Sequence, residues 1–325
     1  MTKIDLITGM LGAGKTTFLH RYARHFIESG QRIAILVNDY GAVNVDMLLL
    51  KDLACENCEL AMVAACNDPF CHRRRFKTQL INLGMMHYDR VLLEPSGIFD
   101  MDEFFDTLHD SPLDRWFEIG SILTVVDASA EDILPPQLDY LFASEAAYAG
   151  MLLLSKLSRT PDTPEQAAER VLKHLNRALE GIRCDRRFAQ ADLIAAEWDT
   201  LTPDQLDALS QAGYRGASYV KQFQPEDYAA GVHYFLHVDL PRDRIEPLLQ
   251  GILHDSACGE ITRLKGSLPD GAGGWLRINA TKTLFEAEPA PDAQAVLIVI
   301  GESPDFAEID RRLRAENTDP KYTAI

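Results

Sequence analysis

The stretch Gly9-Met10-Leu11-Gly12-Ala13-Gly14-Lys15-Thr16 decides the fold of the first part of this 325-residue chain. It fits the pattern G-x-x-x-x-G-K-[ST], and the apolar run Ile4–Ile7 precedes it. A helical spacing of apolar residues follows it and stops at Gly30. The glycines let backbone N–H groups turn inward around phosphate oxygens, and the N-terminus of the following helix adds positive potential. The stretch therefore predicts a phosphate-binding loop between a strand and a helix.

This loop predicts a site for a nucleoside triphosphate with Mg²⁺. The Lys15 ammonium is expected to reach the β- and γ-phosphates, and the Thr16 hydroxyl is expected to hold the metal ion. The residues expected to bind the nucleotide within this loop are Gly9, Gly12, Ala13, Gly14, Lys15, Thr16 and Thr17.

Such a site also needs an acidic group near the metal and a contact to the γ-phosphate. Glu94 and Gly97 lie at the end of a later apolar run and are expected to supply both. Glu94 is expected to hold the metal through water or to orient the attacking water, and the Gly97 N–H is expected to contact the γ-phosphate. Asp39 and Asp46 follow the second apolar run, and their carboxylates can enter the site when that loop closes. The alternative for both is turn chemistry, because Asn, Asp and Gly favour turns.

The pattern along the chain predicts two domains. Residues 1–182 contain apolar runs at 4–7, 33–37, 91–93, 122–126 and 151–154, separated by helical stretches, which is typical of a mainly parallel α/β sheet. Residues 183–230 are polar and are expected to connect the domains. Residues 231–325 predict a smaller α+β domain with a strand at 233–240, a helix at 241–253, strands at 261–265, 275–280, 283–287 and 295–300, and a helix at 305–315.

Composition excludes several classes of partner. Acidic residues outnumber basic ones by 49 to 32, so the net charge of −17 would repel nucleic acid or an anionic membrane. No apolar run approaches the roughly 18 residues of a membrane span, and the N-terminus reaches the glycine-rich loop before a signal-peptide core could form. We expect a soluble cytoplasmic protein whose six cysteines are reduced.

Four of those cysteines lie close together in the sequence, as Cys55-x-x-Cys58, Cys66 and Cys71. Thiolates bind Zn²⁺ tetrahedrally, and Cys-x-x-Cys can supply two ligands from one tight turn. The cluster predicts one site for Zn²⁺ or another transition metal, with His72 or His87 as replacement ligands. An iron–sulfur cluster uses the same ligand type. The alternative is that Cys66 and Cys71 are small buried apolar side chains.

Together these segments resemble the CobW-like P-loop GTPases, a family associated with cobalamin synthesis and metal delivery. The matching stretches are Leu6–Thr17, Asn38–Asp46 and Glu94–Gly97, and the family's second domain is matched more loosely at Glu260–Gly266 and Val299–Gly301. The resemblance implies a P-loop NTPase that couples hydrolysis, of GTP in the first place, to moving or inserting a metal ion. It also implies a client metalloprotein as partner.

The sequence departs from the family pattern in the base-recognition loop. Such GTPases usually carry Asn-Lys-x-Asp there, and the Asp carboxylate accepts two hydrogen bonds from guanine. Here Ser155 and Ser158 occupy the first and last positions, and Lys156 can still lie along the base. Ser158 offers no bidentate carboxylate, and Asp162 is displaced by four positions. Adenine nucleotides must therefore be considered beside GTP.

A second departure concerns the metal motif. The family often has Cys-x-Cys-Cys; Cys66 can match its first cysteine, but Asp68 and Pro69 stand where the pair would be. The leading hypothesis is a nucleotide-hydrolysing metal chaperone or insertion factor whose cysteine site is coupled to the nucleotide. One alternative is an ATP-dependent activator or maturation factor for a metallo- or corrinoid protein, with a structural Cys-bound metal. Another is a non-catalytic, nucleotide-gated scaffold with a structural zinc.

Overall fold

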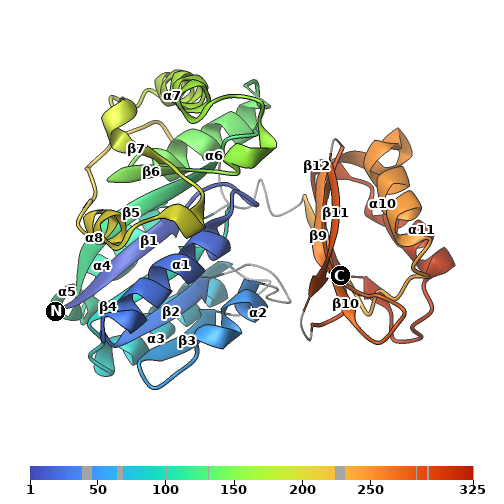
Figure 1. Cartoon of the computed structure of the whole chain (residues 1–325), viewed down its shortest axis with the longest axis horizontal. Helices are drawn as coiled ribbons and strands as arrows, with labels where there is room; N and C mark the ends of the chain where they lie inside the picture. Colours follow the sequence, from blue (N-terminus) through green and yellow to red (C-terminus); the bar gives the residue numbers. More distant parts are fainter. Residues whose placement is uncertain are drawn as a thin grey trace. The chain divides into compact units, whose positions relative to one another are not determined.

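The computed structural model describes residues 1–325 except 39–45, 64–68, 98, 100, 131, 224–230, 283, 291–292 and 325. The chain divides into two compact units (Figure 1). The first comprises residues 1–40 and 49–224, and the second comprises residues 41–48 and 225–325. Within the described residues, no helix has the length and apolar character that crossing a membrane requires.

The first unit is built on a parallel sheet. Its strands are β1 (Thr2–Thr8), β2 (Ile33–Asn38), β3 (Cys58–Val63), β4 (Arg90–Pro95), β5 (Phe117–Asp127), β6 (Met151–Ser155) and β7 (Leu193–Ala195). They pair in the order β3-β2-β4-β1-β5-β6-β7, and every pairing is parallel. The carboxyl ends of all these strands therefore meet at one edge of the sheet, which is where ligands bind in open α/β sheets.

Helices cover both faces of this sheet, which explains why the central parts of its strands are mostly apolar and buried. The helices of this unit are α1 (Lys15–Glu28), α3 (Pro69–Met85), α4 (Met101–His109), α5 (Leu113–Trp116), α6 (Pro136–Ala146), α7 (Pro164–Gly181) and α8 (Pro203–Ser210). A further short helix, α2 (Asp46–Leu50), is divided between the two units. Phe76 of α3 and Phe104 of α4 pack with Ile4 and Leu6 of β1. On the opposite face, Tyr22 of α1 donates a hydrogen bond to the Asp5 carboxylate of β1, at 2.8 Å.

Within the predicted connecting region 183–230, the described residues as far as Phe223 group with the first unit. Strand β7 pairs with β6 and adds an edge strand to the sheet, and α8 packs near β5 and α1. Strand β7 has only three residues, which are too few to show a strand periodicity, so the sequence pattern does not predict it.

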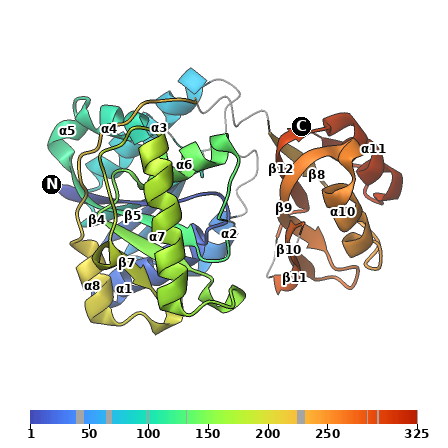
Figure 2. The same ribbon diagram turned by 90° about the horizontal axis from the view of Figure 1, so that it is seen from above.

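The second unit has the expected α+β pattern. Its strands are β8 (Val232–Leu236), β9 (Gly259–Pro269), β10 (Trp275–Thr281), β11 (Leu284–Ala290), β12 (Val296–Pro304) and β13 (Thr323–Ala324). They form an antiparallel sheet in the order β11-β10-β9-β12-β8-β13. Helices α10 (Ile245–His254) and α11 (Phe306–Glu316) share one apolar core on one face of this sheet, as Figure 2 shows.

Candidate functional site

The glycine-rich loop joins β1 to α1 and adopts the strained backbone that its glycines allow. Gly9, Gly12 and Gly14 have φ values of 129°, 83° and 101°, a region that disfavours other residues. A Cβ atom on Gly9 would lie 2.1 Å from the Val125 carbonyl oxygen, so the loop also packs too tightly for a side chain there. The Ala13 N–H donates to the Met10 carbonyl at 3.0 Å and closes the turn. The predicted strand, loop and helix are thus all present.

Three of the predicted site residues converge at this loop. The Lys15 ammonium donates to the carbonyl oxygens of Gly9 at 2.6 Å and Met10 at 3.4 Å. The Thr16 hydroxyl donates to the Glu94 carboxylate at 2.8 Å, although 78 residues separate them in the sequence. All three side chains are buried. The end of β4 therefore brings an acidic group directly to the first turn of α1.

Gly97 packs against the same loop. A Cβ atom on Gly97 would lie only 2.5 Å from the Leu11 nitrogen, so only glycine allows this approach. The neighbouring Ser96 N–H donates to the Asn38 carbonyl at 2.6 Å, which ties the end of β4 to the end of β2. Asp39 lies outside the described residues, as does the side chain of Asp46, so both remain predictions; Thr17 is exposed on α1.

A buried acidic residue that the sequence patterns did not indicate forms a hydrogen bond with the phosphate loop. Glu145 lies near the end of α6, is 1% exposed, and accepts a hydrogen bond from the Gly9 N–H at 2.6 Å. Burial raises the pKa of Glu145 to about 7, against the lowering effect of Lys15 and of the N–H groups of Gly9 and Phe99. Its backbone carbonyl accepts from the Thr8 hydroxyl at 3.0 Å. No sequence motif indicates Glu145, because its contact with Gly9 depends on how α6 packs against the sheet.

The base-recognition loop is tied to the phosphate loop. The Ser155 hydroxyl donates to the Ala13 carbonyl at 2.6 Å, so Ser155 still links the two loops without an Asn side chain. Lys156 has a left-handed backbone, with φ of 55°, and its ammonium contacts the Asp127 carboxylate at 2.5 Å. Lys156, which is expected to lie along the base, therefore forms an ion pair with Asp127 at the end of β5 in this structure.

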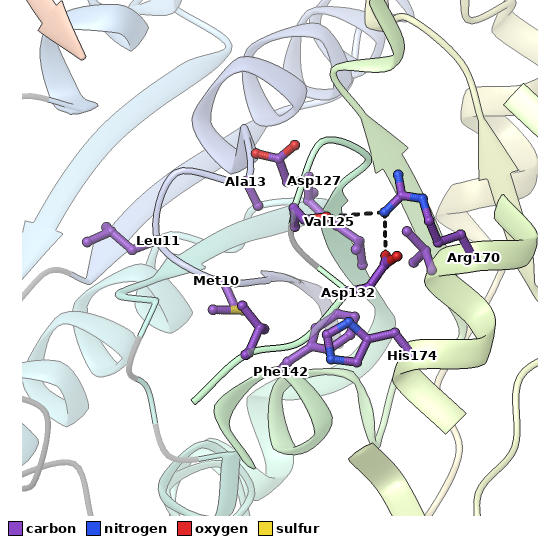
Figure 3. A pocket seen from close by; sticks show the side chains of 13 residues that line it. Met10, Leu11, Ala13, Val125, Asp127, Asp132, Phe142, Arg170 and His174 are labelled. Atoms are coloured by element: carbon purple, nitrogen blue, oxygen red, sulfur yellow. Dashed lines mark hydrogen bonds and ion pairs between the residues drawn. The ribbon is translucent and has the colours of Figure 1, made fainter. Parts of the chain in front are cut away.

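A small pocket lies on one side of the phosphate loop, between the end of β5 and α7 (Figure 3). Its volume of about 130 Å³ is below the roughly 300–1,000 Å³ of ligand pockets, so a whole nucleotide does not fit it. Arg170 of α7 lines it and donates to Asp132 at 2.8 Å and to the Ala128 carbonyl at 2.5 Å. This arginine therefore holds the segment that follows β5.

The described residues do not bring three of the predicted cysteine ligands, Cys55, Cys58 and Cys71, together as one metal site. Cys55 and Cys58 form a tight hairpin turn, in which each N–H donates to the other residue's carbonyl, at 3.2 and 3.1 Å. Cys58 begins β3, whereas Cys71 lies in the first turn of α3, beyond the other end of that strand. Six residues of β3 separate its two ends by about 16 Å. The sulfurs of Cys55, Cys58 and Cys71 are therefore not grouped as ligands of one ion.

The chemical states of these cysteines differ as well. Cys55 and Cys58 are free thiols, and burial together with the neighbouring Cys55 raises the pKa of Cys58 to about 12. Cys71 is disulfide-bonded, so its sulfur is not a thiolate ligand. Cys66 lies outside the described residues. Across the described part of the chain, no three His, Cys, Asp or Glu side chains are grouped to hold a metal ion.

A parallel sheet whose first strand leads into a glycine-rich loop, with lysine, threonine and glutamate gathered around it, defines a P-loop nucleotide-binding protein. Residues 3–183 match the family described as CobW/HypB/UreG, nucleotide-binding domain, and the chain belongs to that family. The resemblance that the motifs indicated is thereby confirmed.

Known proteins similar to this chain include two zinc chaperones of Escherichia coli (strain K12). The chain is 28% identical to YeiR over 170 residues, 52% of this chain and 51% of YeiR. It is 30% identical to YjiA over 164 residues, 47% of this chain and 48% of YjiA. The crystal structure of Zn(II)-bound YjiA GTPase from E. coli aligns with 98% of this chain and 99% of that one, at 20% identity and a TM-score of 0.41. The chain spans about half the length of the curated relatives that it matches.

Proposed function

We propose that this protein hydrolyses GTP and couples the hydrolysis to handing zinc to a client metalloprotein. The observation that carries the proposal is the convergence of Lys15, Thr16 and Glu94 on the phosphate loop. A lysine, a hydroxyl and a carboxylate at a helix N-terminus are the groups that position a triphosphate and its metal ion.

The residues present fit a Mg²⁺ ion. Thr16 and Glu94 offer a hydroxyl and a carboxylate whose oxygens lie 2.8 Å apart, and Mg²⁺ prefers oxygen ligands. When bound, such an ion would supply positive charge to stabilise the phosphates during transfer. Thr16 would hold the ion directly, and Glu94 would hold it through water.

The chain's own groups account for the rest of the site. Lys15 would move its ammonium from the Gly9 carbonyl to the phosphates, and the Gly97 N–H would donate to the γ-phosphate. The alternative role for Glu94 is to orient the attacking water, and Asp39 is proposed as a second carboxylate. Burial strengthens these interactions, because the local dielectric constant is low.

Zinc as the cargo is supported by the relatives, because YeiR and YjiA are both described as zinc chaperones. In this chain the Cys55–Cys58 hairpin offers two sulfur ligands on one turn. Two ligands leave positions in a tetrahedral site open, which suits an ion that must be passed on. The client would complete the coordination during transfer.

The test is hydrolysis of GTP in the presence of Mg²⁺ by the parent and by Lys15→Ala. Loss of charge-assisted contacts to the phosphates should lower kcat/KM by at least about 10–100-fold. Lys173→Ala, which removes an exposed lysine of α7, is the control and should leave turnover unchanged. Equal turnover by Lys15→Ala and the parent would contradict the assignment of the site.

One observation favours a second candidate, an ATP-dependent maturation factor with a structural metal. Ser158 lacks the carboxylate that reads guanine, so the loop as the family builds it would not reject adenine. Titration of GTP and ATP, each with and without one equivalent of zinc, separates the two candidates. Tighter ATP binding, with zinc that does not exchange in any nucleotide state, would favour the maturation factor.

A further inference from the structure

The loops that follow β6 and β7 lie beside each other. The two strands pair in parallel with Leu154 opposite Ala195, so the segments after them leave the same edge of the sheet. The first segment forms a short 3₁₀ helix at Leu157–Arg159, and the second forms one at Trp198–Thr200. Because Ser155 is bonded to the phosphate loop, this pair of loops stands next to the predicted nucleotide site.

Glu197 places a carboxylate between these loops. Its Oε1 atom accepts a hydrogen bond from the Ser158 N–H at 3.1 Å, at the position where the family pattern has its aspartate. Both residues are exposed, so a ligand can reach the carboxylate. The carboxylate that is absent from position 158 is thus supplied in space by a residue 39 positions later in the sequence.

The backbone around Glu197 is well anchored. Its carbonyl accepts from the Thr200 N–H at 2.9 Å and from the Thr200 hydroxyl at 2.8 Å. The Trp198 ring is buried and packs edge-on against Phe18 of α1, with 5.3 Å between ring centroids. Arg21 of α1 donates to the Leu201 carbonyl at 3.0 Å. The segment that carries Glu197 is therefore held by the same helix that begins at the phosphate loop.

The other nearby carboxylate is already paired. Asp162, four positions beyond Ser158, accepts a hydrogen bond from the Arg170 guanidinium at 2.9 Å. That guanidinium also binds Asp132 and the Ala128 carbonyl, so it fixes Asp162 toward α7. A base that used Asp162 would have to break this ion pair, whereas Glu197 only has to release one backbone N–H.

We propose that Glu197 is the residue that reads the base and that it selects guanine. A carboxylate accepts two hydrogen bonds from the guanine N1–H and 2-amino groups. Adenine offers no such pair of donors, because its N1 is an acceptor. The inference rests on the proposed function, since it requires a nucleotide at the phosphate loop.

The experiment titrates GTP, ITP, XTP and ATP, each with Mg²⁺, into the parent, Glu197→Gln and Asp162→Asn. ITP lacks the 2-amino group, and XTP carries a carbonyl in its place. The parent should bind GTP about 10–100-fold more tightly than ITP, XTP or ATP, as expected for hydrogen bonds to a charged group. In Glu197→Gln the amide offers one acceptor and one donor, which match the N1–H and C2 carbonyl of xanthine. GTP affinity should fall, XTP affinity should rise, and the order of the two should reverse.

The controls separate the possible outcomes. Gain of XTP binding shows that Glu197→Gln is folded, and Asp162→Asn should keep the GTP preference of the parent. Reversal in Asp162→Asn but not in Glu197→Gln would assign the base to Asp162 and overturn the proposal. Equal binding of GTP and ATP by the parent and both variants would overturn it too, while leaving the phosphate site intact. No triphosphate binding by the parent would refute the proposed function itself.

Discussion

The Gly9 N–H donates to the Glu145 carboxylate at 2.6 Å, so the first glycine of the phosphate loop is held by a residue of α6 that is 136 positions away. The contact is fully buried, and the pKa of the carboxyl is raised to about 7 because burial disfavours its charged form. Position 145 therefore carries an ionisable group where an amide would make the same hydrogen bond without a charge.

Glu145→Gln should stabilise the protein at high pH and not at low pH. An unfolded glutamate has a pKa near 4.5, so below that value both states are protonated and the favourable contribution of the neutral carboxyl is fully present. It is lost as pH rises toward 7, because the folded state then carries a buried charge. The free energy of unfolding of the variant should exceed that of the parent by at most about 3 kcal/mol at pH 8 and should equal it at pH 4. Denaturant unfolding at both pH values measures this, and a difference independent of pH would contradict it.

Gly97→Ala should damage the nucleotide site, because its Cβ atom would lie 2.5 Å from the backbone nitrogen of Leu11. The phosphate loop must shift to relieve this contact, at a cost of about 1–3 kcal/mol in stability and a loss of nucleotide affinity. Gly181→Ala at the end of α7 is the matched control, since its Cβ atom would meet nothing within 4 Å. Melting temperature and nucleotide titration check both; unaltered nucleotide affinity in Gly97→Ala would mean that the phosphates bind elsewhere.

Thr16→Ala should make nucleotide binding insensitive to Mg²⁺. The Thr16 hydroxyl and Glu94 carboxylate are the oxygen pair that fits the ion, and the variant removes one member. In the parent, chelating Mg²⁺ with EDTA should weaken triphosphate binding by about tenfold or more. In Thr16→Ala, affinity with and without Mg²⁺ should be similar. Thr78→Ala on the exposed face of α3 should behave as the parent does, and a retained Mg²⁺ response in Thr16→Ala would place the ion on other ligands.

The double variant Cys55→Ser/Cys58→Ser should lose zinc affinity by at least about 100-fold, since even outer-shell changes at metal sites cost 10–100-fold. Zinc must displace a proton from Cys58, whose pKa is raised to about 12, so affinity in the parent should increase with pH. Competition with a chromophoric chelator at several pH values measures this. Cys184→Ser, at a buried free thiol away from the hairpin, is the control. Unchanged affinity in the double variant would show that the cargo site lies elsewhere in the chain.

Local sequence patterns predicted what depends on neighbouring residues. The phosphate loop, the carboxylate at the end of β4 and the strands of the second unit all follow from short motifs or from apolar periodicity. The contact of Thr16 with Glu94 was also predictable, because the carboxyl ends of parallel strands share one edge.

The features that sequence missed depend on register and on the length of strands. Cys58 and Cys71 are only 13 positions apart, but Cys58 begins β3 and Cys71 lies in the first turn of α3, so the length of β3 comes between them. Glu145 and Glu197 meet Gly9 and Ser158 only because α6 and β7 pack where they do. Nothing in the local pattern around these residues differs from an ordinary helix or loop.

The bonds from the Lys15 ammonium to the Gly9 and Met10 carbonyls have a consequence for the energetics of nucleotide capture. A phosphate that recruits this ammonium exchanges one set of hydrogen bonds for another, so the gain is the difference between the two sets. The side chain is already ordered and desolvated, and little rotamer freedom is left to lose when it turns to the ligand. Without a ligand, two carbonyl oxygens of the loop occupy the Lys15 ammonium. An anion must therefore carry enough charge to compete with these two neutral acceptors for the ammonium.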